Sequence, residues 1–170
     1  NKFIEWITQK DTSILDFMLL AKTNEYIRLK RNSRWYYPTM KIGARMTIEE
    51  IAEKALTVNE SKLRDRYLLQ AIRALFSLGR YEECINLWNS EIVHYPEGNL
   101  MRQLIHPYIA GAEFHVKRSE KAITYFAELG DVGSMLFCAG RAGETLSTID
   151  ALALVCEYAP NSRYIEGTLQ

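Results

Sequence analysis

Apolar positions recur with the 3.6-residue period of an α-helix along most of the chain, and the alternation typical of strands is almost absent. Short polar stretches rich in Gly, Pro, Asn, Asp and Ser separate the periodic segments. The predicted helices cover 14–31, 47–58, 61–78, 80–94, 100–116, 119–129, 132–141 and 145–158, with a short helix around 3–7 and another after 162. The pattern therefore predicts an all-α fold.

Local signals refine several of these boundaries. Thr47 and Glu50 have the spacing of a capping box, in which each side chain accepts a hydrogen bond from the other residue's backbone amide. Ser61 is the expected N-cap of the next helix. Pro107 lies inside a helical pattern, so a kink or a break is expected near His106.

The composition is that of an ordinary globular protein, with 48% hydrophobic and 25% charged residues and no net charge. This charge balance argues against a nucleic-acid binder that depends on counterion release. No apolar run approaches the roughly 18 residues that span a bilayer. The chain begins without Met, so we expect it to be part of a longer polypeptide, and its compartment stays open.

Three cysteines lie far apart in apolar helical surroundings, which predicts buried thiols rather than a disulfide framework. They are Cys84, Cys138 and Cys156.

The most informative stretch is 68–96, which is typical of two amphipathic helices joined at Gly79 and closed by Pro96. Such a helical hairpin cannot bury its apolar face alone and must stack on neighbours. The stretch resembles a tetratricopeptide repeat (TPR) in having Gly79 and Tyr81 at the turn, small Cys84, bulky Trp88 and the closing Pro96. The resemblance implies antiparallel hairpins stacked as an α-solenoid.

Two weaker copies follow at uneven intervals. The first has Ala122 in the small position and Phe126 in the bulky one, with Lys117 in place of the turn glycine. The second has Gly143 at its turn and Thr148 in the small position. We therefore expect an irregular TPR-like array over 59–170, preceded by N-terminal helices over 1–58 that include an aromatic loop at 32–46.

In this family the first helices of successive hairpins line a concave groove that holds peptides. The resemblance implies that the groove contains Arg66, Leu69, Arg73, Phe76, Phe114, His115, Phe137 and Arg141. Arginines among aromatic rings suit peptides with apolar anchors and carboxylates. The competing interpretation is that the phenylalanines pack between hairpins and the arginines are only solvated.

A second candidate surface is the aromatic loop, where Trp35, Tyr36 and Tyr37 follow a basic stretch. These rings could bind a partner, and a role in stacking on bases is disfavoured. More often, such a loop folds its rings onto adjacent helices as a plug, with the Tyr hydroxyls in water, and we favour this interpretation.

The sequence contains no motif that indicates catalysis or metal binding. The three histidines, His94, His106 and His115, have no helical partner of ligand type, and no Cys-x-x-Cys occurs. Adjacent glutamates at 49–50 and 82–83 are expected on exposed faces rather than in a recessed acid/base pair. We predict no catalytic, cofactor or metal site.

These observations favour a non-catalytic scaffold that binds a protein or peptide, or flanking domains of its own chain, through a concave groove. A second hypothesis is a structural spacer in a larger bacterial protein, with apolar patches at its two ends. The third and least favoured hypothesis is a small-ligand sensor or an enzyme built around the aromatic loop.

Overall fold

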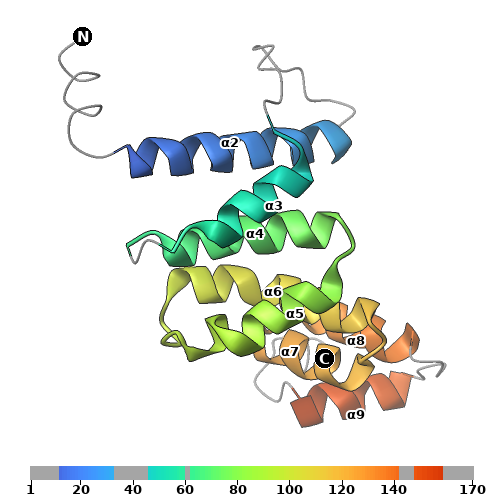
Figure 1. The fold of residues 1–170 in the computed structure, drawn as a ribbon. Coiled ribbons are helices and arrows are strands. Elements are labelled where there is room, and N and C mark those ends of the chain that lie inside the picture. Colours follow the sequence, from blue (N-terminus) through green and yellow to red (C-terminus); the bar gives the residue numbers. More distant parts are fainter. Residues whose placement is uncertain (1–11, 33–45, 60–61, 142–147, 159–170) are drawn as a thin grey trace. The chain divides into compact units, whose positions relative to one another are not determined.

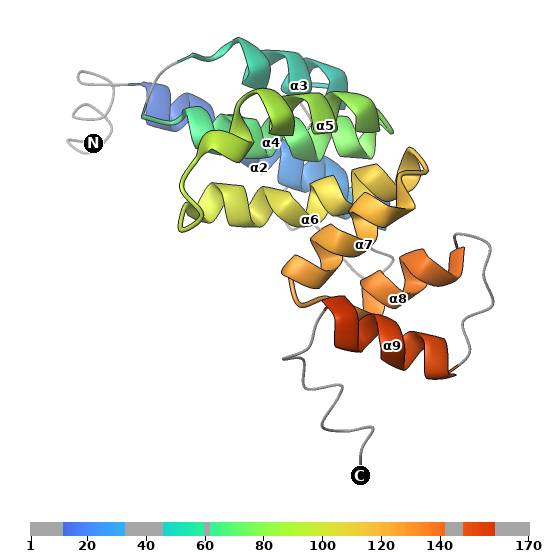
Figure 2. The same ribbon diagram turned by 90° about the horizontal axis from the view of Figure 1, so that it is seen from below.

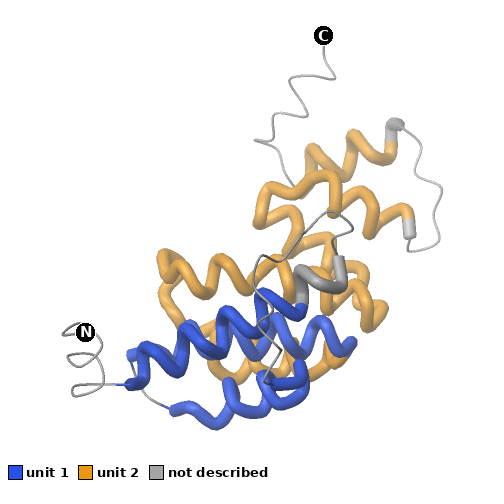
Figure 3. The backbone as a smooth tube through the Cα atoms, turned by 90° about the horizontal axis from the view of Figure 1, so that it is seen from above, with its two compact units in different colours: residues 1–79 blue, residues 80–170 orange. Residues whose placement is uncertain are grey.

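The computed structural model describes residues 12–32, 46–59, 62–141 and 148–158, and all regular structure in these ranges is helical. The prediction of an all-α fold is confirmed for this part of the chain. The chain divides into two compact units, 1–79 and 80–170 (Figure 3).

Unit 1 contains α2 (Ser13–Asn32), α3 (Ile48–Thr57) and α4 (Arg64–Ser77). Helices α3 and α4 pack along each other, and α2 packs on both (Figure 1). Their shared core consists of apolar side chains with almost no exposure, including Leu20, Ile51, Leu68, Ile72 and Leu75. Burial of each such side chain stabilises the unit by about 1.5–3 kcal/mol.

The expected capping box at the start of α3 is confirmed. The Thr47 hydroxyl accepts a hydrogen bond from the Glu50 amide at 3.2 Å, and the Glu50 carboxylate accepts one from the Thr47 amide at 2.7 Å. Two amides that the helix leaves without partners are thereby satisfied.

The predicted start of α4 at Ser61 was wrong. The helix begins at Arg64 with Leu63 as its N-cap, which offers no side-chain hydrogen bond. Arg64 donates from Nη1 to the carbonyls of Leu56 and Val58, at 3.0 and 2.9 Å. These contacts satisfy carbonyls at the end of α3 and place the first residue of α4 against it.

Unit 2 contains α5 (Tyr81–Ser90), a 3-10 turn (Ile92–His94), α6 (Leu100–His115), α7 (Ser119–Glu128), α8 (Val132–Arg141) and α9 (Thr148–Tyr158). Each helix from α5 to α8 packs against the next one in the chain, and α9 packs on α7 and α8 (Figure 2). One core cluster is formed by Val132 and Met135 of α8 and Val155 of α9, and side chains of α7, including Phe126, pack against it.

Helix α6 runs through Pro107 without a break. Of the two expectations at this position, the break was wrong. The missing amide of a proline leaves one carbonyl of the preceding turn without its helical partner. Asn99 begins the helix well, because its side-chain oxygen accepts from the Arg102 amide at 2.9 Å.

The turn after α6 uses a lysine in the conformation that glycine adopts elsewhere in this chain. Lys117 has φ 65°, close to the values of 75° at Gly79 and 69° at Gly130. The Lys117 amide donates to the Phe114 carbonyl and the Arg118 amide donates to the Glu113 carbonyl, so these two carbonyls in the last turn of α6 are satisfied. A non-glycine residue in this region costs about 1–2 kcal/mol.

The predicted hairpin across Gly79 contains helices of both units, because unit 1 ends at this residue. Its packing, and the assignment of 59–170 to one array, therefore stay predictions.

Candidate functional site

An exposed row of rings crosses unit 2 from α5 through α6 to α8. It consists of Tyr81, His115, Phe114 and Phe137, which we call the aromatic row. Tyr81 and His115 stack with ring centres 4.3 Å apart and planes within 5° of parallel. Phe114 follows at 5.8 Å from His115, and Phe137 lies 5.6 Å from Phe114.

The row is open to solvent. His115 is exposed, Phe137 is 53% exposed, and Tyr81 and Phe114 are half-buried. On α8, Gly133 and Gly140 lie about one helical turn before and after Phe137, so no side chain rises next to it at these positions. A large aromatic ring held in water on such a surface is typical of binding sites.

The structure thus brings together three residues that the sequence assigned to the groove, namely Phe114, His115 and Phe137. Because the rings contact each other, each holds its neighbour's orientation. A surface ordered in advance loses less side-chain entropy when a partner binds.

Next to the row, charged side chains connect the starts of α5 and α7 with the end of α6. Arg118 lies 3.1 Å from a carboxylate oxygen of Glu82 and 3.4 Å from one of Glu113. Lys121 lies 4.0 Å from the other oxygen of Glu113. The Glu113 side chain is 2% exposed, so its charge is compensated by these two cations rather than by water.

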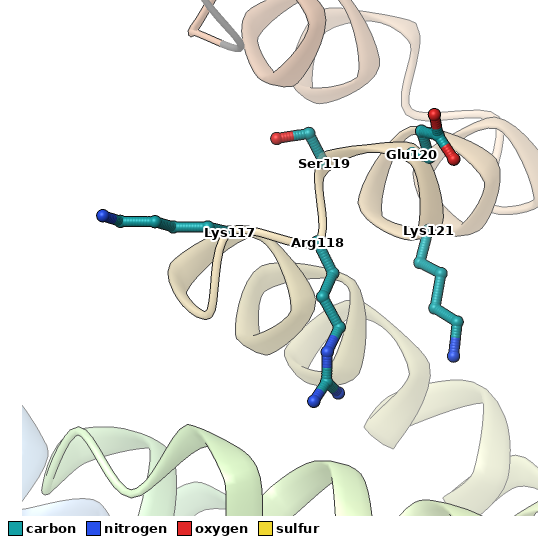
Figure 4. A pocket seen from close by; sticks show the side chains of 5 residues that line it. All are labelled: Lys117, Arg118, Ser119, Glu120 and Lys121. Carbon is teal, nitrogen blue, oxygen red and sulfur yellow. The ribbon is translucent and has the colours of Figure 1, made fainter.

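The same turn borders an open hollow of about 480 Å³ lined by residues 117–121. Arg118 and Lys121 point to one side of the backbone and Lys117 points away from them (Figure 4). Arg118 was not among the arginines assigned to the groove, and it binds two carboxylates of its own chain.

A second aromatic cluster lies between α5, α6 and α7. The His106 ring stacks on Trp88 at 5.0 Å and meets the edge of Tyr125 at 4.9 Å, while the Arg102 guanidinium lies 5.8 Å from the Trp88 ring centre. Burial, reinforced by the charge of Arg102, lowers the pKa of His106. The Glu128 carboxylate is 3.5 Å from His106 Nε2 without forming a hydrogen bond. Burial also raises the pKa of Tyr125.

The four groove residues predicted in unit 1 have different environments. Leu69 is 5% exposed and belongs to the core, so its assignment to a binding surface was wrong. Arg66 is exposed and lies 3.3 Å from the Asp65 carboxylate. Arg73 and Phe76 are half-buried, and Nε of Arg73 is buried without a hydrogen bond.

Other predicted residues lie outside the described residues. Trp35, Tyr36 and Tyr37 belong to 33–45, so neither the partner surface nor the plug is decided. Arg141 ends α8, and its side chain is not among those described.

The cysteines follow the prediction in part. Cys84 and Cys138 are buried, whereas Cys156 is exposed, which corrects the expectation for that residue. Burial raises the pKa of Cys84 to about 12, so its thiol stays protonated. Cys156 comes directly after Val155, whose side chain faces the core, and the helical period turns it away from that core.

Within the described ranges, no group of three or more His, Cys, Asp or Glu side chains has a geometry that could hold a metal ion. In the same ranges, none of the helices combines the length and the apolarity needed to cross a membrane.

Sequence reasoning missed the buried Glu113 and the cluster around His106. A signal for Glu113 was present, because it falls on the apolar stripe of α6 that contains Ile105, Ile109 and Ala112. A glutamate on a buried stripe requires a cation, and Arg118 and Lys121 follow soon after it in the chain.

No family model, curated protein or solved structure matches this chain. The resemblance to TPR proteins therefore stays a prediction from the residues of 68–96.

Proposed function

We propose that this chain is a non-catalytic helical scaffold that binds a partner protein or peptide, as a TPR-like array would, and that the aromatic row is its contact surface in unit 2. The mutually packed rings of exposed His115 and Phe137 and half-buried Phe114 are the observation that carries the proposal.

An open row of aromatic rings suits an extended segment better than a small reacting molecule, which is usually enclosed in a concave pocket. Aromatic residues are also enriched among the few that dominate binding energy at interfaces. The partner would therefore place an apolar side chain beside Phe137, over the glycines of α8.

Selection of peptides from a random displayed library, followed by affinity measurement on the purified chain, tests this proposal. Phe137→Ala should weaken the selected peptides at least tenfold, because truncation of an interfacial aromatic anchor costs about 2 kcal/mol or more. The melting temperature should change little, since this ring is already half in water.

Leu104→Ala is the matched control. This side chain lies in the same unit, is 42% exposed and is not part of the aromatic row. Equal effects of the two substitutions, or no effect of Phe137→Ala, would contradict the proposal.

A second candidate, the structural spacer, is favoured by a separate observation. Helix α2 exposes four large aliphatic side chains near the beginning of unit 1, where a preceding domain could dock: Ile14, Leu15, Met18 and Leu19. If the spacer is correct, Met18→Ser should weaken selected peptides more than Phe137→Ala does.

A further inference from the structure

Lys117 occupies a backbone conformation that suits glycine better. Among the described residues, Gly79, Lys117 and Gly130 have positive φ angles, and Lys117 is the one that is not glycine. Glycine makes such a turn without steric cost, whereas the Cβ atom of a lysine crowds the neighbouring carbonyl oxygen. A cation just after a helix also interacts favourably with the helix dipole, but this gain is smaller than the cost of the backbone. The lysine therefore weakens the turn, and its side chain needs another explanation.

The charge of Lys117 has no partner in the part of the chain that the structure describes. The side chain is exposed and forms no ion pair or hydrogen bond with these residues. The neighbouring cations differ, because Arg118 and Lys121 each lie 4.0 Å or less from a glutamate oxygen. Figure 4 shows Lys117 on the other side of the turn from both of them, and Glu120 also points away from it. Lys117 is thus a surface cation without a carboxylate.

This cation lies at the edge of the aromatic row. The Lys117 amide donates to the Phe114 carbonyl at 3.0 Å, and the Phe114 ring lies 5.8 Å from His115 and 5.6 Å from Phe137. Lys117 also lines the open hollow of about 480 Å³ at this turn, so a segment lying on the row has room beside it. An uncompensated positive charge and solvent-exposed rings therefore share one surface.

We propose that the ammonium group of Lys117 binds a side-chain carboxylate of the segment that contacts the aromatic row. The contact rests on the proposed function of the row and specifies the chemistry of its partner: an extended protein segment with an aspartate or glutamate a few residues from the apolar anchor beside Phe137. A carboxylate complements the unpaired charge and adds specificity to the apolar contact. Residues in strained backbone conformations cluster at binding sites, which agrees with the left-handed backbone of Lys117.

The peptides selected from the random displayed library test this contact, together with versions in which every Asp is changed to Asn and every Glu to Gln. Fluorescence polarisation on the full chain measures Kd at low salt and at about 1 M salt, where the Debye length is about 3 Å. At low salt, Lys117→Gly should raise the Kd of the acidic peptides about three- to fivefold, as expected for an exposed ion pair. It should leave the Kd of the amide versions nearly unchanged, and the difference should vanish at high salt. Lys117→Arg, which keeps the charge, should bind the acidic peptides as the original chain does.

Gly130 offers a control that keeps the net charge of the chain. Its φ is 69°, and a Cβ atom added there would meet no heavy atom within 4 Å beyond its chain neighbours, so a lysine there would have the same backbone as Lys117. Helix α7 separates the two turns, and its 10 residues span about 15 Å. The double variant of Lys117→Gly with Gly130→Lys should therefore bind the acidic peptides as weakly as Lys117→Gly alone.

The outcomes separate this contact from the proposed function. Recovery of affinity in the double variant would show that the peptides respond to net charge and would overturn the contact. Equal effects of Lys117→Gly on acidic and amide peptides, or selected peptides without Asp and Glu, would also overturn it while leaving the aromatic row as a binding surface. Peptides that bind independently of Phe137 would contradict the proposed function, and the contact with it. Unfolding does not explain a loss of affinity, because Lys117→Gly should raise the melting temperature.

Discussion

Removal of the Arg118 charge should destabilise unit 2, because this guanidinium compensates the carboxylate of Glu113. The Glu113 side chain is 2% exposed and lies 3.4 Å from Arg118, whereas Glu82 is 57% exposed and lies 3.1 Å from the same guanidinium. One cation thus contacts a buried and an exposed carboxylate, and the two contacts can be compared directly. Arg118→Met is the suitable change, since it keeps most of the aliphatic stem.

The magnitude follows from distance and exposure. Two unit charges 3.4 Å apart attract by about 5 kcal/mol at an effective dielectric constant of about 20. Arg118 is 44% exposed, so water screens much of this attraction, and Lys121 at 4.0 Å continues to compensate the carboxylate. We therefore expect Arg118→Met to lower the free energy of unfolding by about 1.5–2 kcal/mol, whereas Glu82→Gln should lower it by about 0.5 kcal/mol or less.

Urea denaturation followed by circular dichroism measures these differences without added salt, which would screen the pair. In a double-mutant cycle of Arg118→Met with Glu113→Gln, we expect a coupling energy of about 1 kcal/mol or more. The cycle with Glu82→Gln serves as the control and should give less than half of that. Equal couplings in the two cycles would refute the argument that burial of Glu113 strengthens its contact with Arg118.

Three further predictions concern single residues. Lys117→Gly should raise the free energy of unfolding by about 0.5–1 kcal/mol, because it relieves the left-handed backbone at φ 65°; a lower melting temperature would contradict this. The fold lowers the pKa of His106 below its ordinary value of 6.5. The neutral ring therefore contributes fully to the free energy of unfolding above pH 6.5, and this contribution is lost as the pH falls through the pKa of the folded state. Urea denaturation at several pH values should therefore show stability falling with acidification, and less steeply in His106→Gln; parallel profiles would count against the assignment. With a thiol reagent at neutral pH, Cys156 should react quickly, whereas the buried Cys84 and Cys138 should react only after denaturation. Fast reaction of a second thiol in the folded protein would contradict the burial of Cys84 or Cys138.

Features that depend on neighbours in the chain were predictable from the sequence. The capping box at Thr47 and the helix stop at Gly130 depend on a few adjacent residues, and the structure contains both. The use of Lys117 in a glycine position was visible as a departure from the repeat pattern, and the backbone there is left-handed. Local chemistry decides such sites because the partners are at most four residues apart.

Features that depend on distant residues were not predictable in the same way. Helix α4 begins at Arg64 rather than after Ser61, and the Arg64 side chain donates to the carbonyls of Leu56 and Val58, a contact that no capping pattern encodes. The sequence placed Trp88 at a bulky position, yet the stacking of His106 on it requires α5 and α6 to pack in one particular register. Hydrophobic periodicity predicts which face of a helix is apolar, but it does not predict which element packs against that face.

For the candidate site, too, some residues were predictable from the sequence and others were not. Phe114, His115 and Phe137 were assigned to one surface through the TPR resemblance, and their rings do contact each other in unit 2. Leu69 came from the same assignment and is buried, because a repeat position does not distinguish a packing side chain from an exposed one.

The two apolar surfaces differ in how their side chains are held, and this difference ranks the proposed functions. The face of α2 is aliphatic, and its four large side chains are 38–55% exposed near the beginning of unit 1. The rings of the aromatic row contact one another, so these contacts order the row before a partner binds. Because a surface ordered in advance loses less side-chain entropy on binding, the aromatic row is the surface on which binding should be measured first.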